Sequence, residues 1–101
     1  MDNQGRVQVP EHFRSLSENP ITERANVEIH YYYSTEEELF YFRIEEKGKV
    51  HSDEFLIGIS QFDEKFRIRP LPEIKAKYEK NFILAMKESK IYFLPYERKE
   101  D

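Results

Sequence analysis

The residue types that most often carry out catalysis are sparse and scattered in this sequence. His12, His30 and His51 include no pair four residues apart, and none has a carboxylate at the spacing of a metal site. Three glycines do not form a phosphate-cradling loop, and no Ser-His-Asp signature or nucleophile elbow is present. The sequence therefore favours neither an enzyme nor a bound metal or other cofactor.

Arginine and aromatic side chains are the remaining candidates, and both act by binding. The planar guanidinium group suits phosphates and guanine edges. Tyr31, Tyr33, Phe40 and Phe42 belong to two aromatic runs with more surface than one face of a small domain can bury. Because such rings are enriched at protein interfaces, we expect these four in a contact with a protein partner. Solvated charge and simple core packing are the alternatives.

The composition predicts one folded, soluble domain. A chain of 101 residues with 39% hydrophobic and 15% aromatic residues can build one modest core. Because there is no Trp and no Cys, that core depends on Phe and Tyr, and disulfides are excluded. No apolar run approaches the length of a membrane span, and the start has no signal-peptide pattern. We therefore expect a cytoplasmic protein without a membrane partner.

The net charge of -4 argues against indiscriminate nucleic-acid binding over the whole surface. Residues 1–50 hold six Lys/Arg and ten Asp/Glu, whereas residues 51–101 hold ten of each. Much of the acidity lies in Glu36–Glu38 and Glu45–Glu46, a pattern typical of solvated turns.

The opening stretch predicts a turn, a short strand and a short helix within some fifteen residues. Gly5 suits a tight turn because it tolerates positive φ. Arg6–Val9 alternates polar and apolar residues, as a half-buried strand does. Pro10 suits the first turn of a helix, and Phe13 and Leu16 then share one helical face.

This order of residues resembles the swapped-hairpin DNA-binding domains of the AbrB, MazE and MraZ type. Their core pattern is Asp-x-x-Gly-Arg-[Val/Ile]-x-[Val/Ile]-Pro-x-x-[Leu/Phe]-Arg. The matching residues are Asp2, Gly5, Arg6, Val7, Val9, Pro10, Phe13 and Arg14. In that family two such units interlock into one β-barrel, and arginines around the turn and helix contact DNA. The resemblance implies a transcriptional regulator that contacts double-stranded DNA through Arg6 and Arg14.

The rest of the first half predicts a hairpin. The helix ends before Pro20, and Thr22 could cap a single helical turn. We then expect, in order, a strand at Asn26–Tyr33, a turn at Ser34–Glu37, a strand at Glu38–Ile44 and a linker at Glu45–Lys49 that contains Gly48. The two halves are placed at residues 2–46 and 53–97, with the connection at 47–52.

The second half repeats this order. Asp63 aligns with Asp2, Arg67 with Arg6, Ile68 with Val7, Pro72 with Pro10, and Glu73 with Glu11. The expected elements are a strand at Glu54–Phe62, a helix at Glu73–Lys80, a strand at Asn81–Met86, a turn at Lys87–Lys90 and a strand at Ile91–Tyr96.

The second copy departs from the pattern in ways that bear on structure. Phe66 replaces the turn glycine and is expected to resist positive φ. One residue is inserted at Pro70–Leu71. The first half also lacks a counterpart of the Glu54–Phe62 strand, so a partner or another segment could fill that edge.

Together these features predict a single α+β, mostly β domain in which two strand–helix–hairpin repeats form a small swapped-hairpin barrel. The alternative is an α+β domain with two similar hairpins. The expected DNA contacts are Arg6, Arg14, Lys65, Arg67 and Arg69. The other functional hypothesis is a protein-interaction module, antitoxin-like or an oligomeric adaptor, that keeps the barrel without binding DNA. An unpaired aromatic edge also predicts a homo-oligomer.

Overall fold

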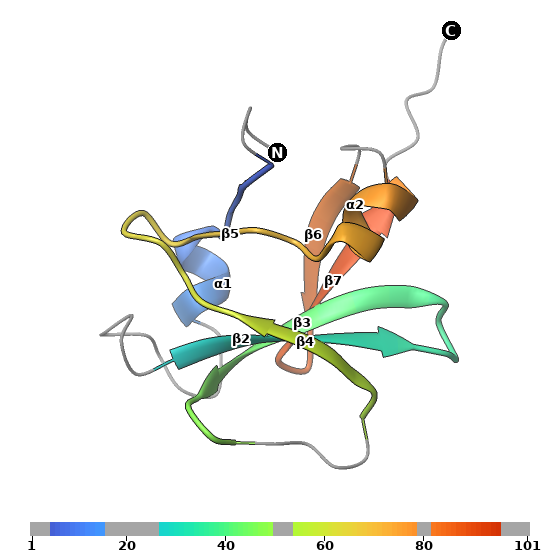
Figure 1. Cartoon of the computed structure of the whole chain (residues 1–101), viewed down its shortest axis with the longest axis horizontal. Coiled ribbons are helices and arrows are strands. Elements are labelled where there is room, and N and C mark those ends of the chain that lie inside the picture. The colour runs from blue at the N-terminus through green and yellow to red at the C-terminus, as the bar shows by residue number, and fades with distance from the viewer. Residues whose placement is uncertain (1–4, 16–26, 50–53, 79–81, 96–101) are drawn as a thin grey trace, which may run out of the picture.

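The computed structural model describes residues 5–15, 27–49, 54–78 and 82–95 of the chain. They form an α+β fold of antiparallel strands and two short helices (Figure 1). In chain order the elements are β1 (Val7–Gln8), α1 (Glu11–Ser15), β2 (Val27–Ser34), β3 (Leu39–Glu46), β4 (Leu56–Ser60), β5 (Arg67–Ile68), α2 (Pro72–Tyr78), β6 (Phe82–Lys87) and β7 (Lys90–Pro95). Neither described helix has the length and apolar character needed to cross a membrane.

The first hairpin is built by β2 and β3, which pair from Val27↔Glu46 to Ser34↔Leu39. Both strands lie within two residues of their predicted positions. The predicted start of the linker at Glu45 is wrong, because β3 continues to Glu46. Glu45 pairs with Glu28 and is only 3% exposed, so this acidic position belongs to the sheet and not to a solvated connection.

The second hairpin is built by β6 and β7, joined by the two residues Glu88 and Ser89. Their φ values of 52° and 65° are both positive, as a type I′ turn requires. That turn matches the right-handed twist of the two strands. Strand β7 also pairs with β3, through Tyr41↔Tyr92, so both hairpins lie in one five-stranded sheet of order β4-β2-β3-β7-β6.

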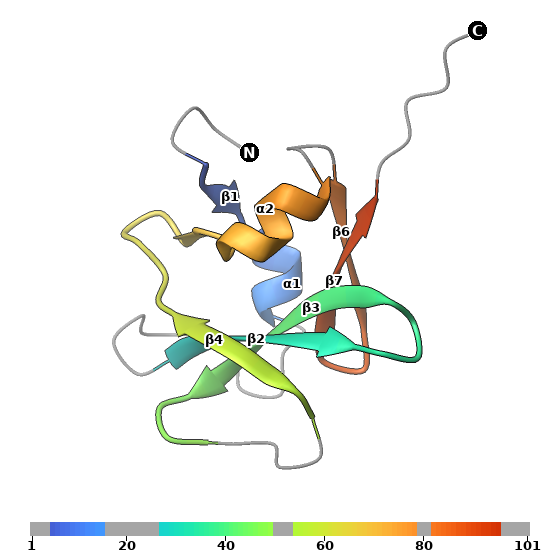
Figure 2. The ribbon, with the colours of Figure 1, turned by 45° about the vertical axis from the view of Figure 1, so that its right-hand side comes forward.

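A two-stranded ribbon, β1 with β5, lies over this sheet. It pairs Val7 with Ile68 and Gln8 with Arg67, and the Val9 amide donates to the Phe66 carbonyl at 3.2 Å. A helix follows each ribbon strand, and Figures 1 and 2 show the ribbon and both helices on the same side of the sheet. In the described part of the chain the sheets are not closed into a barrel, so the swapped-hairpin barrel is not confirmed.

The core lies between the five-stranded sheet and the layer of ribbon and helices. Its fully buried members come from both hairpins, both ribbon segments and α2: Val9, Ile29, Tyr31, Phe42, Ile68, Ile74, Ile91 and Phe93. The rings of Phe42 and Phe93 lie 5.4 Å apart and tilted, which joins the two hairpins. Burying one such side chain contributes roughly 1.5–3 kcal/mol.

The opposite face of the sheet carries a smaller tyrosine cluster. Tyr32 and Tyr41 stack with ring centroids 5.2 Å apart, and Tyr92 packs against Tyr41 at the same distance. Glu54 accepts hydrogen bonds from the Tyr41 hydroxyl and, at 2.9 Å, from Arg43 Nε. Burial and the nearby Glu54 carboxylate raise the pKa of Tyr41, so its hydroxyl remains a donor.

Several sequence predictions lie outside the described residues. These are Asp2, the helix end at Leu16–Pro20, the turn at Thr22, and the part of the linker beyond Lys49, which includes His51.

Candidate nucleic-acid interface

The turn at residues 63–66 organises the ribbon. The Asp63 carboxylate accepts hydrogen bonds from the amides of Lys65 and Arg67, both at 2.9 Å. The Phe66 amide donates to the Asp63 carbonyl at 3.1 Å. Phe66 has a φ of 56°, in the left-handed region that most side chains avoid. The prediction that Phe66 would resist positive φ is therefore wrong.

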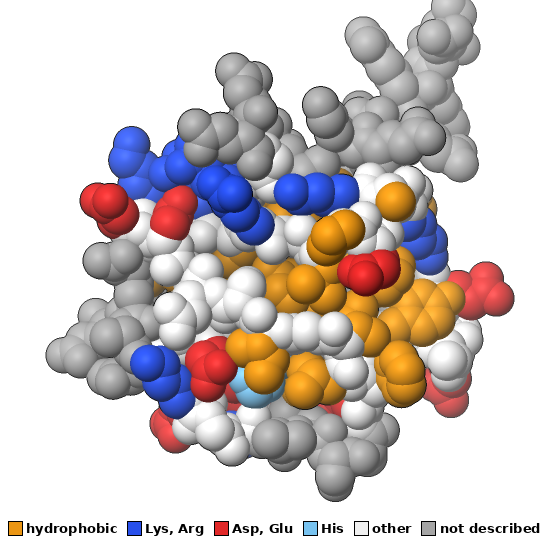
Figure 3. Space-filling view, in the orientation of Figure 1, with side chains coloured by type: hydrophobic (Ala, Val, Ile, Leu, Met, Phe, Trp, Pro, Cys, Tyr) orange, Lys and Arg blue, Asp and Glu red, His pale blue; other side chains and the backbone are white. Residues whose placement is uncertain are grey.

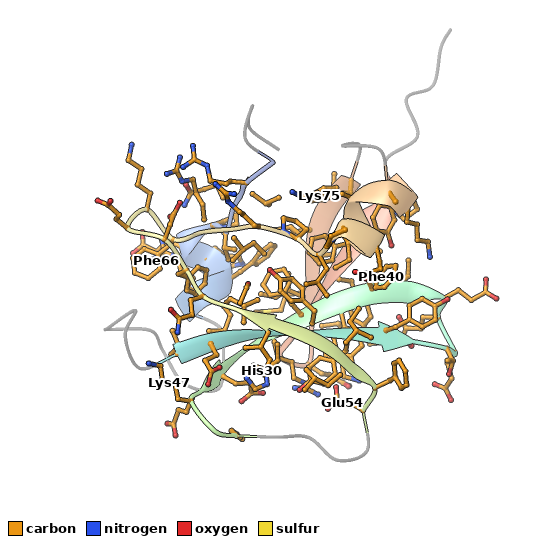
Figure 4. All side chains as sticks on the ribbon, viewed as in Figure 1. His30, Phe40, Lys47, Glu54, Phe66 and Lys75 are labelled. Atoms are coloured by element: carbon orange, nitrogen blue, oxygen red, sulfur yellow. The ribbon has the colours of Figure 1, made fainter. Side chains whose placement is uncertain are left out.

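Contacts of the Phe66 ring explain why the strained backbone is tolerated. The ring meets Phe62 edge-on, with centroids 5.3 Å apart, and Arg14 Cζ lies 4.0 Å above its centre (Figure 4 labels Phe66). Arg14 Nε also donates to the Val9 carbonyl at 3.3 Å. The left-handed conformation costs about 1–2 kcal/mol for a residue other than glycine. Ring packing and the cation–π contact offset that cost.

Asp63 also brings together arginines from the two halves of the chain. Its Oδ2 lies 2.7 Å from Arg67 Nε and 3.9 Å from Arg6 Nη1. Burial opposes the charge of Asp63, but hydrogen bonds from the backbone of Arg67 and Lys65 and from the Arg67 guanidinium outweigh it and lower the pKa of this carboxyl. Asp63 is thus ionised at neutral pH and orients both guanidinium groups.

These residues form part of what we call the basic face: Arg6, Lys65, Arg67, Arg69 and Lys75. All three arginines of this face line one pocket of about 260 Å³ together with Asp63. Lys75 reaches the ribbon from α2, since a Cβ placed on Gly5 would lie 2.7 Å from its Nζ. Figure 3 shows Lys and Arg side chains gathered along the upper edge of the molecule, with acidic groups at one end.

Four of the five predicted DNA contacts belong to the basic face: Arg6, Lys65, Arg67 and Arg69. The fifth, Arg14, lies against the Phe66 ring. Arg14 is engaged by the Phe66 ring and the Val9 carbonyl. The sequence also offers Lys75 and Lys77 as basic residues near these contacts, and the structure brings Lys75 to the face. Lys75 lies in the last turn of α2, the helix that follows β5.

The predicted protein-interface residues divide into two groups. Tyr31 and Phe42 are fully buried in the core and cannot contact a partner. The Tyr31 hydroxyl bonds Ser60 Oγ at 2.9 Å and donates to the Arg69 carbonyl at 3.1 Å, and burial raises its pKa to about 12. Tyr31 thereby connects the core to the backbone of the basic face.

Tyr33 and Phe40 instead line a groove of about 500 Å³, which we call the aromatic groove, with Phe55, Ile57, Glu73 and Lys77. Lys77 Nζ lies 5.4 Å from the centre of the Phe40 ring and donates to the Glu38 carbonyl at 2.7 Å. Phe55 is 68% exposed at the edge of the sheet. Sequence reasoning missed Phe55, because it lies just before β4 and outside the two aromatic runs.

The histidines within the described residues do not form a metal site. His30 is 1% exposed on β2, and neither ring nitrogen has a hydrogen-bond partner in this part of the chain (Figure 4). His12 lies against Phe13, with ring centroids 5.9 Å apart. No group of three His, Asp or Glu side chains among the described residues could hold a metal ion.

Comparisons with known proteins assign no family to the chain. No protein-family model matches it, and no curated protein or solved structure shows significant similarity. The resemblance to the AbrB, MazE and MraZ type therefore remains a prediction from the sequence pattern. A functional proposal has to be argued from the geometry of the basic face and the grooves.

Proposed function

We propose that the protein binds double-stranded DNA through the basic face and acts as a transcriptional regulator. The observation that carries the proposal is the convergence of Arg6 with Arg67 and Arg69, from segments far apart in the sequence, around one small pocket. Asp63 offsets only part of the repulsion among these three cations, so the pocket keeps a net positive charge. A phosphate or a guanine edge suits such a pocket.

The shape of this region supports the proposal. Arg67 lies in the short antiparallel ribbon and Arg6 and Arg69 directly flank its strands, and the DNA major groove admits a two-stranded antiparallel ribbon. Ionised Asp63 fixes the guanidinium groups of Arg6 and Arg67, so less side-chain entropy is lost when they bind.

The distribution of negative charge is also compatible with DNA. The acidic turn at Glu36–Glu38 lies at the tip of the β2–β3 hairpin, on the side of the molecule away from the ribbon (Figure 1). A duplex on the ribbon would therefore avoid the most acidic stretch of the described residues. The net charge of -4 makes contact outside the basic face unfavourable, which favours a defined orientation.

The test is a fluorescence-anisotropy titration with duplex DNA at several salt concentrations. Arg69→Ala and Arg6→Ala each remove one cation from the basic face and should lower the salt slope by about one counterion. Lys47→Ala removes the same charge from an exposed position away from the ribbon and should leave the slope unchanged (Figure 4). Absence of binding at tens of micromolar in low salt, or an equal loss in Lys47→Ala, would overturn the proposal.

The aromatic groove favours a second candidate, a protein-interaction module that assembles as a homo-oligomer. A ring as exposed as Phe55, beside Tyr33 and Phe40, is typical of an association surface. Sedimentation over a range of concentrations should show self-association that Phe55→Ser weakens and Ile83→Ser, at the other edge of the sheet, does not. A stable monomer at high concentration would exclude the homo-oligomer.

A further inference from the structure

The described elements form two sets with the same order. One set is β1, α1 and the β2–β3 hairpin, and the other is β5, α2 and the β6–β7 hairpin. The sets meet in equivalent pairings, β1 with β5 and β3 with β7. Strand β4 alone breaks the match: it directly precedes β5 and pairs with β2 of the other set. A counterpart of β4 would directly precede β1 and pair with β6.

The position of such a counterpart is an open sheet edge in the described structure. Strand β6 pairs with β7 only and ends the five-stranded sheet. A groove of about 660 Å³, which we call the β6 groove, runs between this edge and the β1–α1 segment. Its lining residues are Arg6, Val7, Gln8, Pro10, Phe13, Arg67, Phe82, Ile83 and Leu84.

The equivalent place on the other side of the molecule is filled by β4. There, Gly58 lies so close to the Leu71 side chain that an added Cβ would be 2.8 Å from it. Ser60 of β4 bonds the Tyr31 hydroxyl at 2.9 Å. The fold thus already contains one extended strand between a hairpin edge and a ribbon segment, and the β6 groove has corresponding boundaries but no such strand among the described residues.

The backbone of β6 is arranged to receive a strand. Lys87 and Lys90 close the two-residue hairpin, so their pair is hydrogen-bonded, and the pattern alternates along the strand. The amides and carbonyls of Leu84 and Met86 therefore face the open edge. An exposed row of such groups is a template for a further strand.

The side chains that line the β6 groove indicate which kind of segment would bind there. Its lining combines apolar side chains with Arg6 and Arg67, and among the described residues none that lines it is acidic. Ile83 is 49% exposed beside these arginines. An extended segment that alternates apolar and carboxylate residues would bury one set against Phe82 and Leu84 and pair the other with the guanidinium groups.

We propose that the β6 groove is a docking site for an extended, acidic and apolar segment of a partner protein, which adds antiparallel to β6 as a sixth strand. The antiparallel direction follows from the β4–β2 pairing. This site is separate from the proposed DNA function, but Arg6 and Arg67 belong to both surfaces. A bound segment would therefore compete with DNA.

The test uses a capped seven-residue peptide that alternates glutamate and valine, titrated into the full chain. We expect binding with a Kd below about 1 mM and slower hydrogen exchange at the Leu84 and Met86 amides. A peptide of the same sequence with alternate amides N-methylated keeps its charge and side chains but cannot form the ladder. Equal binding of the two peptides, or no binding of the first, would overturn the proposal.

A matched pair of protein variants locates the site. Ile83 and Ile59 are 49% and 50% exposed, one at each edge of the same sheet. Ile83→Glu places a carboxylate in the β6 groove and should weaken peptide binding about tenfold, whereas Ile59→Glu should leave it unchanged. An equal loss in both variants would show that the peptide does not bind at β6. The outcome is independent of whether the wild type binds DNA.

Discussion

Gly5 lies shortly before β1 and Phe66 directly before β5, and both have a left-handed backbone conformation for opposite reasons. Their φ values are 74° and 56°. Gly5 avoids strain because it has no Cβ, and Lys75 approaches the space that a side chain would take. Phe66 keeps its side chain and is held by Phe62 and Arg14. A left-handed backbone conformation can thus be tolerated either because the residue has no Cβ or because the contacts of its side chain offset the strain.

The largest effect is expected when the Phe66 ring is removed. Phe66→Ala keeps the strained φ but loses the contacts with Phe62 and Arg14, so we expect a loss of about 2–3 kcal/mol, below the range for a fully buried ring. Phe66→Gly loses the same contacts but relieves the strain, and should be less destabilised by about 1 kcal/mol. Urea unfolding measures both. A Phe66→Gly variant more stable than wild type would show that the ring does not hold the turn.

The second prediction concerns Asp63, which stabilises the Phe66 turn from its other side. Asp63→Asn loses the ionised acceptor of Arg67 Nε and should cost about 1.5 kcal/mol at neutral pH, because its side chain is partly exposed. The pKa of Asp63 is lowered in the folded state, so its contribution is complete above the unfolded pKa of about 4. It is lost as the pH falls through the lower folded value.

Unfolding of wild type and Asp63→Asn across pH provides the check. The difference in unfolding free energy should be constant from neutral pH down to about 5 and should shrink below about 4. A difference that stays constant into strong acid would mean that the carboxylate charge is not responsible. Asp2, the counterpart of Asp63 in the sequence, lies outside the described residues.

Local sequence patterns were sufficient to predict the helices and strands named below. They were not sufficient to predict which side chains are buried on each face of the sheet. Alternation located β2, the nearly continuous aromatic and apolar run at Leu39–Ile44 located β3, and the position of Pro72 located α2. Alternation put Tyr31 on the face of Val27 and Ile29, which is the core face, but it could not indicate that Tyr32 is buried as well. Tyr31 and Tyr32 are both fully buried, on opposite faces of the sheet.

Features that depend on distant contacts could not be predicted from the sequence. The expectation for Phe66 followed from local sterics, whereas its conformation depends on Arg14, which is remote in the chain. The cation–π contact likewise gives Arg14 a setting beside Phe66 that local patterns could not indicate. The grouping of Arg6 with Arg67 depends on the pairing of β1 with β5 and on their shared contact with Asp63.

The third prediction tests the glycine turn. Gly5→Ala introduces a Cβ at a φ of 74° and displaces the Lys75 side chain. Strain of about 1–2 kcal/mol, less the entropy that alanine loses in the unfolded chain, predicts a net loss of about 1 kcal/mol. Thermal or urea unfolding measures this loss, and Lys75→Ala provides the control. If Gly5→Ala were neutral in both backgrounds, the turn would not require glycine.

The smallest effect is expected at Ser89, which also has a left-handed backbone conformation. Unlike Gly5 it has a Cβ, and unlike Phe66 it has no ring to pack. Its φ is 65° in the tip of the β6–β7 hairpin, where the residues form a type I′ turn that favours glycine at this position. Ser89→Gly removes strain of about 1–2 kcal/mol but adds freedom to the unfolded chain, so we expect a net gain of about 0.5 kcal/mol. Ser89→Ala keeps a Cβ and should bring no gain. If Ser89→Gly lowered the unfolding free energy, or if Ser89→Ala raised it equally, side-chain contacts of Ser89 would outweigh its backbone strain, as the ring contacts of Phe66 do.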